Sequence, residues 1–216
     1  WITAHWDKTD FAAVNALAIR LAGSGIPVSA MYRPRFLGPP SVAVQTKPDG
    51  ASAFEHGDEI RYTDAKAREW GYSWGCEILK KCPGISEIII YNPRNIDDSP
   101  EAREAIRTDP DARLKAVAGF LAEARSAWRA VRPDIRLGLV SVSTPDAWRF
   151  VADSIDAAHP FLVVKDDVDI EQNVLEVAQL RDILGARLST CLAKVTWGET
   201  DKVAPLKLAQ LNEGAR

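Results

Sequence analysis

Short runs rich in β-branched residues alternate with longer amphipathic runs along almost the whole chain, and this order limits the possible folds more than any other feature. The strand-like runs are residues 2–6, 27–32, 85–91, 136–142, 161–165 and 188–197. The helix-like runs that follow them are residues 11–22, 64–81, 110–131, 145–158, 169–184 and 202–212. Consecutive strands of such a series pair in parallel, because each helix returns the chain to the edge from which it came.

The strongest strand pattern is Ile-Ser-Glu-Ile-Ile-Ile-Tyr at residues 85–91, whose apolar centre favours burial on both faces. Six strand–helix units predict an α/β fold, a (β/α) TIM-barrel-type domain that is about two units short of a closed barrel. An open, doubly wound parallel sheet is the alternative. No Gly-x-Gly-x-x-Gly motif follows a strand, which disfavours the dinucleotide-binding form of that alternative.

The chain of 216 residues is long enough for one large domain, and we expect residues 1–216 to form it. It begins with Trp1 and has no initiator Met, as in a processed chain or a piece of a longer protein. We therefore expect an additional segment or chain to complete the barrel. The compartment is unknown, and a secreted or periplasmic location is compatible with the missing Met.

Four local predictions concern the connections between these elements. Residues 36–61 read as a long irregular insert, rich in Gly, Pro and polar residues. Pro110 is predicted at the first position of its helix. Asp169 is predicted to cap the fifth helix. His159 is predicted to precede the fifth strand, on the edge of the sheet away from a site.

Composition excludes some partners. The net charge is −3 and the pI is near 5.7, so no basic surface for nucleic acid is expected. No apolar run reaches the roughly 18–20 residues needed to span a membrane, and we expect a soluble domain.

The cysteines Cys76, Cys82 and Cys191 form no disulfide framework, and we interpret them as buried thiols. With only three histidines, a zinc site is disfavoured and no cofactor is expected.

Polar and aromatic residues recur at the carboxyl ends of all six predicted strands. Ligands gather at this edge in both barrels and open parallel sheets. The predicted substrate-binding residues there are His5, Trp6, Tyr32, Arg33, Arg35, Tyr91, Asn92, Arg94, Lys165, Lys194 and Trp197. The alternative is a set of ordinary solvated loop residues and helix caps.

Three carboxylates at this edge are candidates for acid–base chemistry. Glycoside hydrolysis needs one protonated carboxyl group as the acid and one ionised group as base or nucleophile. We predict Glu199, beside Trp197, as the acid and Asp166 or Asp7 as its partner. The same three carboxylates could instead hold Mg²⁺.

Other residue types at this edge suggest further roles. Trp6 and Trp197 could stack on sugar rings, whereas Trp70, Trp74, Trp128 and Trp148 lie at helical positions and read as packing. Arg33, Arg35 and Arg94 could bind a carboxylate or phosphate, with surface ion pairing as the alternative. Lys165 and Lys194 allow a second enzyme hypothesis, a Schiff-base lyase of the aldolase kind.

Three segments carry a resemblance to a known group of proteins: Trp-Ile-Thr-Ala-His-Trp-Asp at residues 1–7, Tyr-Arg-Pro-Arg at residues 32–35, and the run from Gly84 to Asn95. Together they resemble the family-10-like glycosyl hydrolases and related TIM-barrel glycosidases. The resemblance covers about the first hundred residues and implies a barrel that acts on a glycan. The chain departs from that pattern at Tyr91-Asn92 and at Ser141 and Ser143, where such enzymes often carry acidic residues. A non-catalytic glycan-binding or scaffold module is therefore the runner-up.

Overall fold

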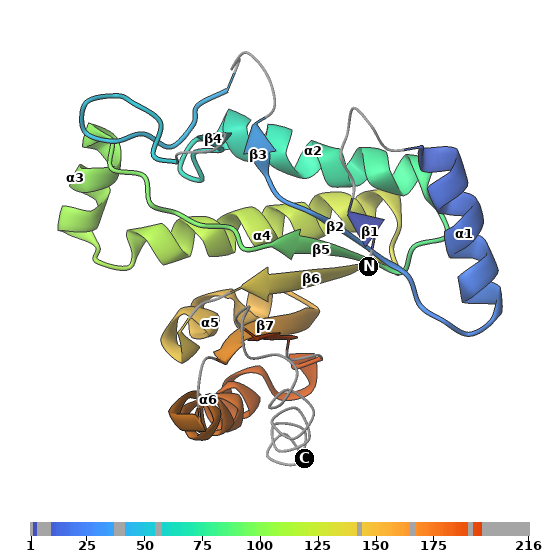
Figure 1. The fold of residues 1–216 in the computed structure, drawn as a ribbon. Coiled ribbons are helices and arrows are strands. Elements are labelled where there is room, and N and C mark those ends of the chain that lie inside the picture. The colour runs from blue at the N-terminus through green and yellow to red at the C-terminus, as the bar shows by residue number, and fades with distance from the viewer. Residues whose placement is uncertain are drawn as a thin grey trace.

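A computed structural model of the chain describes residues 2–3, 10–36, 42–54, 58–141, 144–164, 167–189 and 192–195. Six strands form one parallel sheet in the order β1-β2-β5-β6-β7-β8 (Figure 1). Their bounds are β1 (Ile2–Thr3), β2 (Ser29–Tyr32), β5 (Glu87–Tyr91), β6 (Arg136–Ser141), β7 (Ala157–Val164) and β8 (Leu192–Val195). Every neighbouring pair is parallel, so the prediction of a parallel α/β fold is confirmed.

Helices connect the strands, and the first three begin after side chains that cap them. They are α1 (Phe11–Gly23), α2 (Ala65–Lys81), α3 (Pro100–Thr108), α4 (Ala112–Val131), α5 (Pro145–Val151) and α6 (Asp167–Leu184). Asp10, Asp64 and Ser99 accept hydrogen bonds from backbone N–H groups in the first turns of α1, α2 and α3. These bonds satisfy donors that a helix leaves unpaired at its start.

One face of the sheet forms the main core with the helices. Tyr32, Ile90, Leu139 and Ala158 are successive register partners, so their side chains share this face. All four belong to one buried cluster, to which α2, α4, α5 and α6 contribute. The largest helix side chains in it include Phe120, Trp128 and Trp148. The predicted packing role of Trp128 and Trp148 is therefore confirmed, and Trp70 and Trp74 pack against the same cluster half-buried.

The opposite face of the sheet is also buried. Ile89, Val140 and His159 alternate with the core residues along their strands, and each is at most 4% exposed. A sheet covered on both faces fits the interior of a barrel and explains why residues 88–90 are three consecutive isoleucines.

Helices α2 and α4 approach each other closely because α2 carries Gly71 and Gly75 on the side facing α4. A Cβ atom at Gly71 would lie 2.6 Å from Ile60 and 3.1 Å from Phe120. At Gly75 it would overlap the indole of Trp128. The Trp128 indole fills this space and donates its Nε1–H to the carbonyl of Tyr72 at 2.9 Å.

The segment at residues 36–61 is more ordered than predicted in its described part. Strands β3 (Arg35–Phe36) and β4 (Asp58–Glu59) form an antiparallel pair. Two further antiparallel bridges join Val44 to Ile60 and Thr46 to Ser52. The prediction of an irregular insert therefore holds for most of its described residues and is wrong for β3, β4 and the bridges, because ladders of one or two residues leave little periodic signal in the sequence.

Three boundary predictions are also wrong. Helix α4 begins at Ala112, and Pro110 lies in the turn before it. Helix α6 begins at Asp167, so Asp169 lies inside its first turn. His159 lies within β7, paired with Val140, because α5 ends at Val151 and the strand already begins at Ala157. Only its predicted place before the strand is wrong, since it lies beside Glu87, the first residue of β5, on the side away from the predicted site. The helix-favouring alanines at 157 and 158 hid this boundary.

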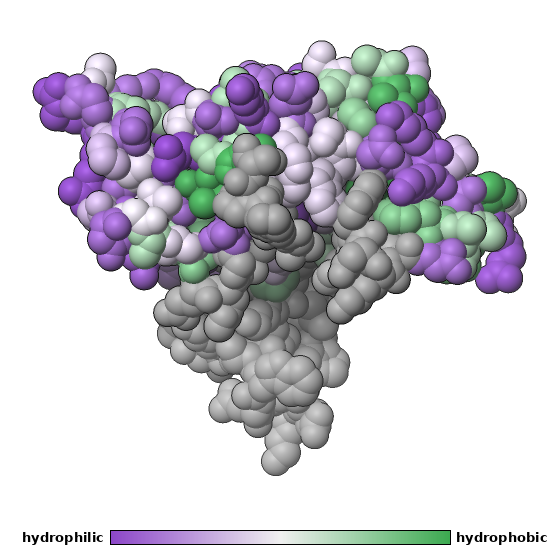
Figure 2. All heavy atoms as spheres, turned by 90° about the horizontal axis from the view of Figure 1, so that it is seen from above, coloured by the Kyte–Doolittle hydropathy of each residue, from purple (hydrophilic) through white to green (hydrophobic). Residues whose placement is uncertain are grey.

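The face drawn in Figure 2 is mainly polar in its described part. Figure 2 shows hydrophilic side chains over most of the described atoms of one face, with small, separate apolar areas. None of the described helices is both long and apolar enough to cross a bilayer. Cys82 is buried and Cys76 is half-buried, so the prediction of buried thiols holds fully only for Cys82, while Cys191 lies outside the described residues.

Candidate functional site at the carboxyl edge of the sheet

The six parallel strands end at one edge, where the sequence predicts the site. The structure describes the side chains of Tyr32, Arg33, Tyr91, Asn92 and Arg94. Only the backbone is described for Arg35 and Lys194. Arg35 lies in β3, and Lys194 lies in β8, where it pairs with Val163 of β7. The other predicted residues lie outside the described part: His5, Trp6, Asp7, Lys165, Asp166, Trp197 and Glu199.

Tyr32 is a core residue. Its side chain lies on the helix face of the sheet, its ring is 6.0 Å from that of Trp128, and its hydroxyl donates to the carbonyl of Gly71 at 3.2 Å. Burial raises the pKa of this hydroxyl well above its ordinary value. Only 4% of Tyr32 is exposed, so its side chain has almost no surface that a substrate could contact. The prediction that Tyr32 binds substrate is therefore wrong.

Arg33 follows β2 and pairs with a carboxylate that the sequence did not single out. Its Nε and Nη2 donate to Oε2 of Glu59 at 3.2 and 3.1 Å. The other oxygen of Glu59 accepts from the hydroxyl of Tyr62 at 2.7 Å and from the backbone N–H of Arg94 at 3.0 Å. Burial raises the pKa of Glu59 above its ordinary value, although all these hydrogen bonds oppose the rise. Glu59 has no exposed surface, so it serves as an anchor between the ends of β2 and β5.

The loop after β5 is fixed from the same side by Gln45, which is fully buried. Its amide donates to the carbonyls of Ile60 at 3.0 Å and Arg94 at 2.7 Å, and its oxygen accepts from the N–H of Ile96 at 2.8 Å. At the start of this loop Asn92 has a φ of 43°, a left-handed conformation that Asn adopts more readily than most residues. The loop therefore holds a specific shape, built by residues of the insert.

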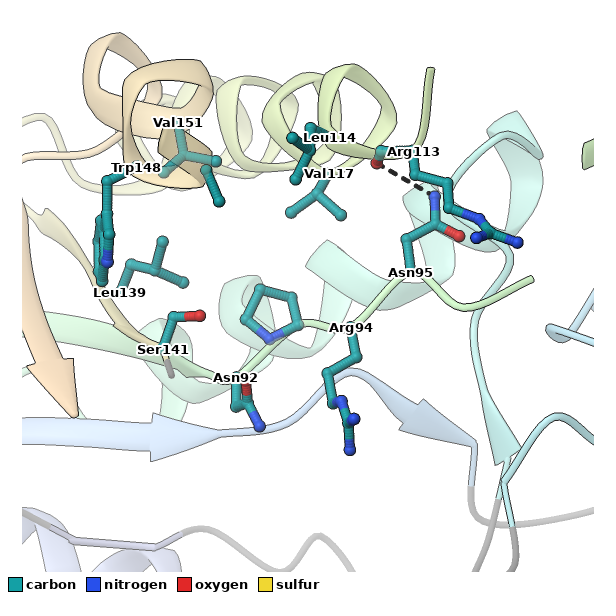
Figure 3. Close-up of a pocket in the computed structure, with 12 residues that line it drawn as sticks. Asn92, Arg94, Asn95, Arg113, Leu114, Val117, Leu139, Ser141, Trp148 and Val151 are labelled. Atoms are coloured by element: carbon teal, nitrogen blue, oxygen red, sulfur yellow. Dashed lines mark hydrogen bonds between the residues drawn. The ribbon is translucent and has the colours of Figure 1, made fainter. Parts of the chain in front are cut away.

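A pocket of about 190 Å³ opens beside this loop. It lies between the ends of β5 and β6 and the helices α4 and α5 (Figure 3). Its apolar lining comes from Pro93, Leu114, Val117, Leu139, Ala147 and Val151. Its polar lining comes from Asn92, Arg94, Asn95, Arg113, Ser141 and Trp148. Figure 3 shows Trp148 and Leu139 at one end, and Arg113 and Asn95 at the other.

Asn95 and Arg113 are linked within the pocket wall. The Asn95 amide donates to the carbonyl of Arg113 at 3.2 Å, and Arg113 Nη2 donates to the carbonyl of Asp97 at 2.6 Å. Asn95 Oδ1 accepts from the N–H of Asp97 at 3.4 Å. These bonds connect the first turn of α4 to the loop after β5, so both sides of the pocket are held together.

The opposite, amino-terminal edge of the sheet carries a second polar cluster, Ser29, Glu87 and His159. Ser29 Oγ donates to Glu87 Oε2 at 2.7 Å, and His159 Nε2 lies 3.5 Å from Glu87 Oε1. Burial would raise the pKa of Glu87. Hydrogen bonds from His159 and Ser29 and the charges of His159 and Arg136 outweigh that effect and hold the pKa below its ordinary value. Among the described residues, no group of three or more His, Cys, Asp or Glu side chains is arranged to hold a metal ion.

The parallel strands and covering helices define a (β/α) barrel-type protein whose barrel is incomplete in the described part. No protein-family model matches the chain, and no curated protein is similar to it in sequence. Solved structures do share its fold. Ega3 from Aspergillus fumigatus, solved in complex with galactosamine, is 9% identical, with a TM-score of 0.55 over 97% of this chain and 81% of its own.

Two further solved structures are more distant. The α-galactosidase from Lactobacillus brevis is 7% identical, with a TM-score of 0.47 over 93% of this chain. A psychrophilic family 10 endo-β-1,4-xylanase is 14% identical, with a TM-score of 0.44 over 88% of this chain and 57% of its own. The chain spans 31% of the length of the α-galactosidase. Ega3 alone of these three has a TM-score above 0.5, and its likeness confirms the barrel-type fold that the resemblance implies.

Proposed function

We propose that this chain is the barrel domain of a carbohydrate-active protein of the glycoside hydrolase kind, with its glycan bound at the carboxyl edge of the sheet. The observation that supports this most is the fold shared with Ega3 over 97% of the chain. In parallel barrels this edge carries the active site, since the loops that follow the strands converge there. The anchored ends of β2 and β5 supply Arg33, Asn92 and Arg94 to it.

Catalysis in this proposal belongs to three carboxylates from strand ends. Glu199 acts as the acid that protonates the leaving oxygen. Asp166 or Asp7 acts as the base or nucleophile. The separation of the two carboxyl groups decides the stereochemistry, with about 5–5.5 Å for retention and about 6.5–9.5 Å for inversion.

The test is turnover of oligosaccharides that contain galactosamine or galactose, the sugars in the names of Ega3's ligand and of the α-galactosidases. Glu199→Gln is expected to lower kcat by at least about a thousandfold, because the amide cannot deliver a proton. Glu104→Gln is the matched control, an exposed carboxylate of α3 that pairs with Arg107 of the same helix. Unchanged turnover in Glu199→Gln, Asp166→Asn and Asp7→Asn would contradict the assignment.

A non-catalytic glycan-binding module is the second candidate, favoured by one observation. The ends of β5 and β6 carry Asn92 and Ser141, and no carboxylate lines the pocket between them. A binding module would retain a glycan on an affinity column without releasing reducing ends, and Glu199→Gln would leave that retention unchanged. Loss of retention together with turnover would favour the enzyme.

A further inference from the structure

Arg33, at the end of β2, has a guanidinium group that is fixed in place but only partly bonded. Its Nε and Nη2 both donate to Oε2 of Glu59, at 3.2 and 3.1 Å. Its Cζ lies over the ring of Phe54, 6.0 Å from the centroid. Nη1 carries two further N–H donors, and it is not among the enclosed atoms that lack a partner. Because the side chain is 20% exposed, these donors are open to a ligand.

Glu59 holds this guanidinium in one orientation. Its side chain has no exposed surface, and it also accepts from the hydroxyl of Tyr62 and the backbone N–H of Arg94. Taking a carboxylate out of water can cost more free energy than an ion pair returns, so stability alone explains such a group poorly. The geometry that it fixes explains it better. A guanidinium that is already held loses little entropy on binding, and its planar fork matches a carboxylate.

Arg94 adds a second positive charge next to this pair. Its backbone N–H lies 3.0 Å from Oε1 of Glu59, which places it beside the Arg33 ion pair. The side chain of Arg94 is exposed and forms no ion pair with a described carboxylate. Figure 3 shows its guanidinium pointing away from the pocket between α4 and α5. Arg33 and Arg94 thus carry two positive charges beside one carboxylate, and this excess favours an anionic ligand.

Tyr91 lies at the same level of the neighbouring strand. Tyr32 and Ile90 are register partners, and Arg33 and Tyr91 are the residues that follow them. Tyr91 shares a face of β5 with Ile89, the face away from the helices, because side chains alternate along a strand. It is half-buried, and its ring is a rigid apolar surface on which the C–H face of a sugar can pack. A charged donor and an aromatic ring therefore stand side by side at this edge.

We propose that Arg33 and Arg94 bind a carboxylate of the glycan, so that the glycan at this edge contains uronic acid units. This rests on the proposed function and names the class of sugar that the site prefers. The carboxylate pairs with Nη1 of Arg33 and with the Arg94 guanidinium, and the ring of the same sugar packs on Tyr91. Asp166 and Glu199 follow β7 and β8 in the sequence, and β6 separates β5 from β7 in the sheet. The uronic acid therefore occupies a subsite on the β2 side of the edge.

The test is isothermal titration of the full chain with three tetrasaccharides that differ mainly in charge, built from galacturonic acid, galactose or galactosamine. The galacturonic acid tetramer is expected to bind at least about tenfold more tightly than the galactose tetramer. The galactosamine tetramer should bind most weakly, because its ammonium groups are repelled. These differences should shrink in about 0.5 M salt, which screens the charges. A sulfated galactose tetramer separates the two kinds of anion, and its tighter binding would overturn the assignment to a carboxylate.

Two variants locate the contact. Arg33→Lys keeps the charge that the buried Glu59 requires but loses the planar fork, and it should weaken binding of the galacturonic acid tetramer about fivefold. Arg94→Gln changes an exposed side chain without an ionic partner, so the fold is kept, and it should weaken that binding about threefold. Both should leave binding of the galactose tetramer nearly unchanged. Arg125→Gln is the matched control, since Arg125 is 27% exposed and pairs with Asp156, just before β7.

The outcomes separate this inference from the proposed function. Cleavage of the galactose or galactosamine tetramer without any preference for the acidic one would overturn the inference alone. Binding of the galacturonic acid tetramer that depends on Arg94, with no cleavage of any tetramer, would support the inference and contradict the hydrolase. A preference for the acidic tetramer that neither variant reduces, or no binding of any tetramer at millimolar concentration, would also overturn the inference.

Discussion

The two edges of the parallel sheet treat their polar side chains differently. At the amino-terminal edge Ser29, Glu87 and His159 contact one another, and the side chains of Glu87 and His159 are at most 8% exposed. At the carboxyl edge Trp148 and Arg113 present buried donors that the described residues leave unpaired. A polar group that is paired inside the chain adds to stability. A buried polar group without a partner lowers stability, because it has lost its hydrogen bonds to water. The comparison contrasts a cluster of polar side chains that contact one another with two donors that find no partner among the described residues.

The largest expected effect is at the enclosed cluster. Glu87→Ala is expected to lower the free energy of unfolding by about 3 kcal/mol, because the buried His159 loses the carboxylate beside it and the half-buried Ser29 loses its acceptor. Urea denaturation followed by far-UV circular dichroism measures this. Glu104→Ala, on the exposed side of α3, is the control and should change little. An unchanged midpoint in Glu87→Ala would remove the distinction between the edges.

The same carboxylate makes stability depend on pH. The pKa of Glu87 is lowered in the folded state from an unfolded value near 4.5. Its contribution is therefore fully present above pH 4.5 and is lost as the pH falls through the lower, folded value. Between pH 6 and about pH 3.5, wild type should lose more stability than Glu87→Gln, which has no such proton to bind. Parallel curves for the two proteins would show that the pairing has no effect.

The anchor of the loop after β5 should have an intermediate effect. Gln45→Ala removes three hydrogen bonds in a buried position and is expected to cost about 2 kcal/mol. The amide of Ile96 should then exchange its hydrogen faster, since it loses its acceptor. Hydrogen exchange by mass spectrometry measures this. Gln172→Ala, exposed on α6, is the matched substitution and should leave that exchange rate unchanged.

The smallest effect compares two buried tryptophans. Trp128→Phe removes an indole that donates to Tyr72, and Trp148→Phe removes one whose N–H is unpaired. Both lose similar volume, so the difference reports the hydrogen bond. Trp128→Phe is expected to cost about 1 kcal/mol more than Trp148→Phe. Equal losses would mean that the Nε1–H of Trp148 also has a hydrogen-bond partner in solution.

Much of the fold could be predicted because its signals are local. The isoleucine run at residues 88–90 marks a buried strand, and the helices predicted from residues 11 and 64 begin at Phe11 and Ala65. The start of β7 at Ala157 could not be predicted, because two alanines favour a helix and only pairing with β6 makes them part of a strand. The pairing of β3 with β4 could not be predicted, because strands of two residues are too short to show an alternating pattern in the sequence.

The sequence could place the candidate site at the carboxyl edge of the sheet, but it could not predict which residues contact one another there. Glu59 and Gln45 act through bonds to residues 35 to 51 positions away, and no local pattern in a loop indicates such partners. Trp148 was read as packing, which it is, but its unpaired Nε1 depends on its surroundings in three dimensions. One signal was present in the sequence: Trp148 lies in the first turns after Thr144-Pro145, a helix start that follows a strand end.

The two glycines of α2 also offer a way to find relatives of this chain, for which sequence comparison gives no family. A side chain at Gly75 cannot coexist with Trp128, so a homologue that keeps this helix pair and has a larger residue at 75 must have a smaller one at 128. A small residue at 71 and at 75, matched with aromatic residues at 120 and 128, is thus a signature that should survive divergence after overall identity has faded.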